Sequence, residues 1–386
     1  MINIVDKKKC TGCMACYNSC PVNCIQMQED NEGFWYPCVD KKNCINCGKC
    51  EKSCPFLENV IPASDFELCY AAYNKNDKER AISSSGGIFL ALAKYVIDMG
   101  GIVYGAAYNC DMMVYHKKAE NITELLDLVG SKYLQSRLDR VYGEIQKFLE
   151  DRRYVMFVGT ACQIAGLRGF LKKEYDNLLT VDFICLGVPS PKVWKDYLET
   201  FFDKRNIKFV NFKDKTWGWH TFSLRIDDPE IKIRNGRETY YFAGYFKQLY
   251  SRPSCSECYF KGKNRVSDIT ISDCWGYEYI ASEMDDNRGL SSIECHSDKG
   301  IQIFDSIKNK LEWKESNIED VKKYNSNYCE SAPMGRQRSR FWKDYDLLSK
   351  EELFNKYCKP EKETGLELIV KLIGSIPRKI KRKLRR

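Results

Sequence analysis

Apolar residues follow strand-like and helix-like spacings in turn between residue 67 and about residue 208. Short continuous apolar runs predict buried strands, and the longer segments between them have the period of helices. The expected strands are residues 68–73, 101–108, 154–158 and 178–185, and the expected helices are residues 83–99, 123–129, 138–150, 162–172 and 191–202. This alternation is typical of βαβ units around a partly parallel sheet. The sequence therefore predicts a mixed α/β domain, in a fold class between α+β and α/β.

The pattern differs on both sides of this region. Beyond about residue 208, short alternating runs at 221–226 and 238–242 predict an antiparallel portion. Before residue 67, cysteines dominate, and a linker rich in proline, serine and aspartate follows them. The expected organisation is an N-terminal cysteine-rich module at 1–62, a domain in two parts at 67–150 and 151–330, and a peripheral appendix with a basic tail at 331–386.

Eight of the 20 cysteines form two runs near the N-terminus. Each run has the spacing C-x2-C-x2-C-x3-C-P, and the second follows the first at an offset of 34 residues. This is the bacterial ferredoxin pattern, in which the fourth cysteine of each run binds the cluster of the other run. The repeat predicts two [4Fe–4S] clusters with the ligand sets Cys10, Cys13, Cys16, Cys54 and Cys44, Cys47, Cys50, Cys20.

A disulfide framework and a pair of zinc sites both fit these runs less well. A disulfide framework needs an oxidising compartment, and the first residues show no apolar signal segment. Zinc sites rarely repeat with this spacing. Many cysteines without an export signal are typical of a reducing cytoplasm. The sequence therefore predicts a bacterial ferredoxin-like electron-transfer module.

Positive charge is concentrated at the C-terminus. The formal net charge is +8, and the last nine residues contain seven lysines and arginines and no acid. The rest of the chain is nearly neutral, so we expect no nucleic-acid partner. Apolar residues 366–373 precede the basic end, which leaves a solvated tail and a peripheral contact with an anionic membrane both open. No apolar run reaches the roughly 20 residues of a membrane span, so we expect a cytoplasmic protein, free or peripheral at the inner membrane face.

Four more cysteines stand where they could meet. Cys162 lies in the turn after one expected strand and Cys185 ends the next, so both should reach the carboxyl edge of the sheet. Cys255 and Cys258 form a C-x2-C pair, which can place two thiolates on one metal. The spacing alone leaves four interpretations open: a third [4Fe–4S] cluster, a zinc site, a redox pair, or buried free cysteines. Cys274 is a further candidate ligand that could take the place of one of these four cysteines.

A helix start at residues 83–87 has the sequence Ser-Ser-Ser-Gly-Gly. Its unpaired N–H groups and helix dipole suit an anion such as a pyrophosphate, and an ordinary serine N-cap is the other interpretation. No G-x-G-x-x-G follows a strand, so a Rossmann NAD site is not supported. The three histidines, His116, His220 and His296, have no ligand spacing and are expected to be structural.

Several segments together resemble one family. The segment Gly159-Thr160-Ala161-Cys162-Gln163-Ile164-Ala165-Gly166-Leu167 resembles the G-T-P-C-Q-x-A-G-L signature of the coenzyme F420 hydrogenase/dehydrogenase beta-subunit family. Segments 130–133, 181–191 and 267–276 also fit it, and Ser85-Gly86-Gly87 matches its glycine-rich helix opening. The resemblance covers about residues 67–330. The N-terminal ferredoxin fusion resembles a bacterial branch often found among polysaccharide-biosynthesis genes.

This resemblance implies an FAD-binding fold with its own [4Fe–4S] cluster. The family's cluster cysteines correspond to Cys162, Cys185, Cys255 and Cys258. The flavin contacts that it implies are Ser85, Gly86, Gly87, Ser131, Lys132 and Tyr133. In two departures, Ala161 replaces the family's proline and Leu186 its histidine. The first could loosen the turn that aims Cys162.

The expected function is that of an iron–sulfur flavoprotein oxidoreductase. It would pass electrons between a two-electron carrier or substrate at FAD and the [4Fe–4S] clusters, and the related branch suggests a link to polysaccharide biosynthesis. The alternative is a non-enzymatic electron-transfer subunit of the ferredoxin type that serves a partner enzyme. The expected partner is a redox protein or a soluble electron carrier, and F420, a nicotinamide and ferredoxin all stay open. No catalytic acid or base is required, because the cofactors supply the chemistry.

Overall fold

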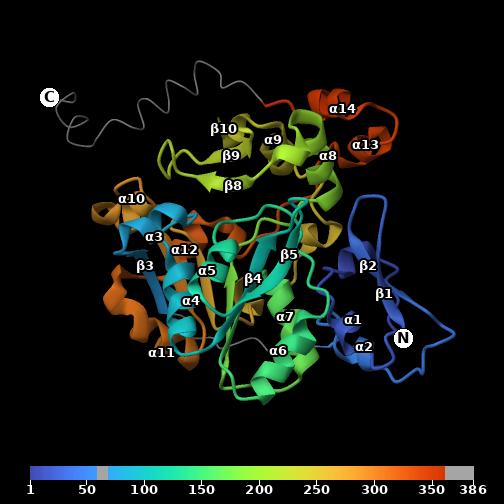
Figure 1. Cartoon of the computed structure of the whole chain (residues 1–386), viewed down its shortest axis with the longest axis horizontal. Coiled ribbons are helices and arrows are strands. Elements are labelled where there is room, and N and C mark those ends of the chain that lie inside the picture. The colour runs from blue at the N-terminus through green and yellow to red at the C-terminus, as the bar shows by residue number, and fades with distance from the viewer. Residues whose placement is uncertain (59–67, 361–386) are drawn as a thin grey trace.

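The computed structural model describes residues 1–58 and 68–360 (Figure 1). The N-terminal module consists of two short helices and an antiparallel hairpin, with the order α1 (Ala15–Ser19), β1 (Ile25–Glu29), β2 (Trp35–Val39) and α2 (Lys49–Lys52). Its backbone repeats with the cysteines. Left-handed residues occupy Gly12 and Met14 in the first run and Asn46 and Gly48, 34 positions later, in the second. The internal repeat predicted from the sequence is therefore a repeat of conformation as well.

A mixed sheet of eight strands forms the centre of the larger domain, in the order β13-β3-β12-β11-β7-β6-β4-β5. Strands β4, β6, β7 and β11 run parallel, and β5, β12, β3 and β13 add antiparallel pairs at the two sides. The bounds are β3 (Leu68–Asn74), β4 (Ile102–Tyr108), β5 (Val114–Ala119), β6 (Val155–Val158), β7 (Leu178–Phe183), β11 (Ile269–Asp273), β12 (Ser291–Cys295) and β13 (Leu311–Ser316). The four strands expected from the apolar runs are β3, β4, β6 and β7. The α/β prediction is confirmed.

Alternate residues of the strands fill two cores, one on each face of the sheet. Val103 and Met156 face a core with α4 (Ile88–Asp98) and α11 (Asp298–Ile307). Tyr104 and Phe157 face a core with α6 (Val141–Glu150) and α7 (Ala161–Leu171). The N-terminal module packs on this second face, where Met14, Ala15 and Trp35 join the same core; Figure 1 shows the module beside α6 and α7.

A smaller antiparallel sheet lies beyond one end of the central sheet (Figure 1). Its strands are β8 (Phe209–Asp214), β9 (Ser223–Asp228) and β10 (Glu230–Asn235), as the alternating pattern predicted for the region around residues 221–226. An aromatic core joins this sheet to α8 (Pro191–Phe201), α9 (Tyr240–Phe246), α13 (Arg338–Asp344) and α14 (Lys350–Tyr357). The remaining helices are α3 (Asp77–Ile82), α5 (Ile122–Leu125), α10 (Tyr277–Ile280) and α12 (Ile318–Tyr324).

Two expectations about this layer need correction. The strand expected at residues 238–242 is wrong, because Thr239 caps α9 by accepting a hydrogen bond from the N–H of Phe242 and the aromatic residues that follow are buried on a helix. The stretch from residue 331, expected to be peripheral, contributes buried side chains such as Phe341 and Phe354 to the aromatic core. The basic tail, within residues 361–386, lies outside the described residues. In the part of the chain that the structure describes, no helix is long and apolar enough to cross a bilayer.

Candidate functional site

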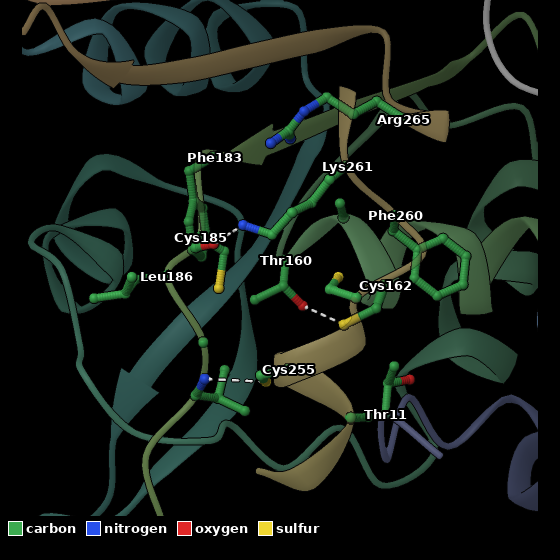
Figure 2. A pocket seen from close by; sticks show the side chains of 15 residues that line it. Thr11, Thr160, Cys162, Phe183, Cys185, Leu186, Cys255, Phe260, Lys261 and Arg265 are labelled. Atoms are coloured by element: carbon green, nitrogen blue, oxygen red, sulfur yellow. Dashed lines mark hydrogen bonds between the residues drawn. The ribbon is translucent and has the colours of Figure 1, made fainter. Parts of the chain in front are cut away.

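The third set of cysteines lies at the carboxyl edge of the parallel strands, where open α/β sheets bind their ligands. Cys162 stands in the first turn of α7, directly after β6, and Cys185 follows the end of β7. Cys255 belongs to the short 3₁₀ helix η5 (Pro253–Glu257), and Cys258 follows it. All four cysteines line one pocket, and Figure 2 shows Cys162, Cys185 and Cys255 around the same space. The cysteines that the sequence analysis grouped are therefore brought together by three separate segments.

The turn that holds Cys162 is well defined although Ala161 replaces the family's proline. The backbone N–H of Thr160 donates to Oε1 of Gln163 at 2.9 Å, within a capping box at the start of α7. Thr160 Oγ1 lies 3.1 Å from the sulfur of Cys162. The hydrogen bonds of a capping box thus replace the rigidity that a proline would supply. Leu186, at the other departure, packs against the aromatic core.

Two positively charged side chains line one side of the pocket of the third cysteine set. Lys261 donates to the carbonyl oxygen of Cys185 at 2.9 Å, and Arg265 is paired with the buried Asp182 at 2.6 Å; Lys261 and Arg265 both line the pocket. Burial raises the pKa of the four thiols, to about 12 for Cys255, and the nearby Lys261 partly opposes this for Cys185. Thiols must lose their protons to bind a metal, so these cations favour the ligating form.

The four thiols form a donor set of a kind that binds soft metal ions and iron–sulfur clusters. A tetrahedral zinc site with Zn–S bonds of about 2.3 Å needs its sulfurs roughly 3.8 Å apart. Among the described residues, no three or more His, Cys, Asp or Glu side chains are arranged to hold one metal ion. Four thiols around one largely apolar pocket suit a [4Fe–4S] unit, which binds through four cysteines. Cys274, the competing ligand, is buried instead in a separate core with Trp219 and Leu290.

The structure brings the fourth cysteine of the first ferredoxin run to the other run. Cys20 lines one pocket together with Cys44, Cys47 and Cys50, the three leading cysteines of the other run. Burial raises the pKa of Cys13 to about 12, and the thiols of Cys54 and Cys10 act on it electrostatically from close by. Cys24 also lines the pocket of Cys20, with its sulfur 3.4 Å from that of Cys20.

The segments that resemble flavin-binding elements meet each other. Both the backbone N–H and the hydroxyl of Ser131 contact the hydroxyl oxygen of Ser84, at 2.7 and 3.0 Å. Gly87 has a φ of 88° and begins α4 without a side-chain cap, so the first N–H groups of this helix have no capping side chain. The structure thus joins residues 83–87 and 130–133 next to an uncapped helix start.

Several of the expected flavin contacts are already engaged within the protein. Ser85 donates its hydroxyl hydrogen to the carbonyl oxygen of Leu290, and the N–H of Gly86 donates to the hydroxyl of Ser291. A methyl group added at Gly86 would lie 2.5 Å from the carbonyl oxygen of Ala72, so this glycine allows close packing of the loop on the sheet.

Lys132 and Tyr133 point in different directions. The ammonium group of Lys132 donates to the carbonyl oxygens of Asp127 and Val129, and burial lowers its pKa to about 7. The ring of Tyr133 packs edge-on against Phe242 and Tyr245. The ring of Tyr133 therefore lies at the edge of the aromatic core, and its role as a flavin contact stays a prediction.

Two lysines that nothing in the sequence singles out lie beside the expected flavin contacts Ser85 and Tyr133. Lys213 forms a buried ion pair with Asp273 at 2.8 Å, and the indole N–H of Trp219 donates to the same carboxylate at 3.0 Å. Lys215 donates to the carbonyl oxygens of Arg80, Ser85 and Arg288. Asp273 lies in a segment that resembles the family, but isolated lysines on a polar stretch carry no signal in one sequence.

The histidines have structural environments, as expected. His116 is buried, with Nδ1 2.7 Å from the hydroxyl of Ser136 and Nε2 3.0 Å from the carbonyl oxygen of Val158. Burial lowers its pKa to about 4, so it is neutral at pH 7. His220 pairs with Asp285, and His296 is buried beside Thr270.

The mixed α/β fold and the two N-terminal cysteine runs are those of an iron–sulfur, oxidoreductase-like electron-transfer subunit. Residues 152–321 match the family described as the C terminus of the coenzyme F420 hydrogenase/dehydrogenase beta subunit, and residues 9–57 match the 4Fe–4S dicluster domain. The two matches thus place a segment similar to the C terminus of this beta subunit behind a dicluster ferredoxin segment, where the sequence motifs lie.

Comparison with solved structures gives a distant likeness. A chain in a structure of the F420-reducing [NiFe] hydrogenase complex from Methanosarcina barkeri is 16% identical, with a TM-score of 0.44. The alignment covers 76% of this chain and 92% of that chain. No curated protein matches this chain.

Proposed function

We propose that this chain is a flavin-dependent iron–sulfur oxidoreductase with three [4Fe–4S] clusters. The observation that carries the proposal is the single pocket formed by Cys162, Cys185, Cys255 and Cys258, against which the first ferredoxin run packs. Thr11, which follows Cys10 in that run, lines the same pocket. The module is therefore seated with its first cysteine run toward the third set.

The three clusters and the flavin would be held by residues already described. The two ferredoxin sets and the third set supply twelve thiolates for three clusters. FAD would lie near residues 83–87 and 130–133, beside the uncapped helix start at Gly87. When bound, the flavin exchanges two electrons with a carrier or substrate and the clusters carry single electrons.

The chain's own residues supply charge and shelter. Lys261 and Arg265 offset the thiolates of the third set, while Phe183 and Phe260 form part of the apolar wall of its pocket. Lys213 stays positive because, although burial opposes its charge, Asp273 and Tyr133 lie beside it and raise its pKa. A fixed cation there would stabilise negative charge on a ligand near Tyr133.

The decisive experiment is anaerobic quantitation of iron, sulfide and flavin in the purified full chain. We expect about twelve iron atoms and one flavin per chain. A preparation without flavin would overturn the flavoprotein proposal, and about eight iron atoms would overturn the third cluster. Hydride exchange of the isolated chain with F420 or a nicotinamide would separate an enzyme from a pure electron relay.

One side of the second ferredoxin set, at Cys47, faces solvent and suits a partner. Cys47 is exposed, and Ile45 beside it is 61% exposed. The exposed lysines around this run are Lys41, Lys42, Lys49 and Lys52, and none of them forms an ion pair with a described residue. An apolar tip with a cationic rim favours an acidic redox protein as the electron partner.

Reversing this charge should slow electron transfer to such a partner. With a reduced acidic ferredoxin as the probe, the double variant Lys41→Glu/Lys42→Glu should react about tenfold more slowly at low ionic strength, because steering depends on surface charge. The control variant Lys195→Glu/Lys208→Glu changes the net charge equally at exposed lysines on the smaller layer. Equal rates for the two variants in stopped-flow measurements would argue against this docking face.

A further inference from the structure

Arg252 joins the third cysteine set to the first ferredoxin run. It stands just before η5, and its backbone N–H donates to the carbonyl oxygen of Val188 at 2.9 Å. The N–H of Cys255 donates in turn to the carbonyl oxygen of Arg252 at 2.9 Å. Its backbone is therefore fixed within the loops that carry Cys185 and Cys255.

The side chain of Arg252 leaves this pocket and enters the N-terminal module. Its Nε donates to the carbonyl oxygen of Cys10 at 2.8 Å, and Nη2 donates to the carbonyl oxygen of Trp35 at 3.0 Å. Nη2 also lies 3.6 Å from the sulfur of Cys10. The guanidinium lies over the ring of Tyr36, 4.3 Å from its centroid. One side chain thus contacts both the hairpin of the module and its first cysteine.

This cation is buried without a carboxylate in contact. Arg252 is 1% exposed, and its remaining hydrogen bond goes to the amide oxygen of Gln135 at 3.0 Å. Within the described residues, no Asp or Glu oxygen accepts a hydrogen bond from it. A buried charge without a counter-ion is costly, and arginine does not lose its proton in proteins. The group in contact that can carry negative charge is the thiolate of Cys10.

We propose that Arg252 positions the first ferredoxin run against the third cysteine set and raises the reduction potential of the cluster that Cys10 helps to hold. The inference rests on the proposed function, in which Cys10, Cys13, Cys16 and Cys54 bind a cluster. Taking up one electron makes the cluster and its thiolates one charge more negative, and a fixed cation with an N–H toward a ligand sulfur stabilises that state.

The second ferredoxin set lacks such a cation among the described residues. The side chains that line its pocket with Cys20, Cys44, Cys47 and Cys50 are apolar or uncharged, apart from the N-terminal ammonium group of Met1, which pairs with Glu51. Arg252 therefore makes the two clusters of the module unequal, with the one nearer the third set easier to reduce. Hydrogen bonds to charged groups are strong enough for a tenfold effect on the reduction equilibrium.

The test is a redox titration of the full chain monitored by electron paramagnetic resonance. In Arg252→Gln, the reduction equilibrium of one ferredoxin cluster should fall about tenfold, which corresponds to about 59 mV for one electron, while the other cluster keeps its midpoint. Arg252→Lys retains the charge and should restore most of the potential. Arg140→Gln is the matched control, because Arg140 also donates to the module, at the carbonyl oxygen of Tyr17 (2.6 Å), without a contact to sulfur.

Each outcome decides the proposal. An unshifted midpoint in an Arg252→Gln variant with full iron, or an equal shift in Arg140→Gln, would overturn it. If Arg252→Gln does not retain its clusters, Arg252→Lys decides: a smaller downward shift of the same cluster supports the proposal and an unchanged midpoint overturns it. If the wild-type chain binds no iron at the ferredoxin sets, the proposed function itself is wrong.

Discussion

Replacing Cys258 by alanine should lower the iron content from about twelve to about eight atoms per chain. The thiol lies in the pocket shared with Cys162, Cys185 and Cys255, and a four-iron cluster needs all four thiolates in this protein because no other described cysteine lines that pocket. The two ferredoxin clusters have their own ligand sets and should remain. Acid-labile sulfide should fall in the same proportion, and flavin content should be unchanged.

Cys274→Ala is the matched control for this experiment. Cys274 is also a buried cysteine, 2% exposed, in a segment that resembles the family, but it packs with Trp219 in a separate core. Removing its sulfur should leave the iron content at the wild-type value and cost only a small loss of packing. If Cys274→Ala lost four iron atoms and Cys258→Ala lost none, the assignment of the third ligand set would be wrong.

Gly166→Ala should destabilise the protein and disturb the first ferredoxin cluster. Gly166 lies one turn after Cys162 on α7, where a methyl group would come 2.8 Å from Cβ and 2.9 Å from Sγ of Cys13. Such overpacking costs about 1–3 kcal/mol, which exceeds the roughly 0.5–1 kcal/mol that alanine gains over glycine within a helix. We expect a lower denaturation midpoint and a changed paramagnetic signal from one cluster, measured anaerobically.

Gly143 offers a matched control on the neighbouring helix α6. A methyl group added there would meet nothing within 4 Å. Gly143→Ala should therefore keep both the cluster signals and the stability, or raise the free energy of unfolding by about 0.5–1 kcal/mol. If Gly166→Ala were as stable as Gly143→Ala and left the signals unchanged, α7 would not set the distance between the ferredoxin run and the third cysteine set.

Local patterns were sufficient for the elements with strong periodicity. The apolar runs that predict strands correspond to β4, β6 and β7, which are parallel strands with both faces buried, and to β3, an antiparallel strand that is also buried on both faces. The error at residues 238–242 has the opposite origin. Aromatic residues favour strands in isolation, but the cap at Thr239 and the aromatic core formed with α8 and α14 stabilise a helix there.

No local pattern in the sequence predicts the order of the strands in the central sheet. Strand β3 lies between β12 and β13, so the parts 67–150 and 151–330 share one sheet. Helices α13 and α14, from the stretch that was expected to be peripheral, complete the aromatic core of the smaller layer. These arrangements depend on contacts between residues far apart in the chain, which the spacing of apolar residues within one segment does not encode.

The sequence by itself determined the iron–sulfur chemistry of this protein, because cluster ligands within one run are local and their spacing carries the geometry. The backbone repeats with the same 34-residue offset in its left-handed residues, and Cys20 lies with the three leading cysteines of the other run. Only the tertiary structure decided how the sets face one another. Arg252, Gly166 and the Lys213–Asp273 pair act through neighbours that are distant in sequence, since burial and charge are properties of the folded chain rather than of any segment.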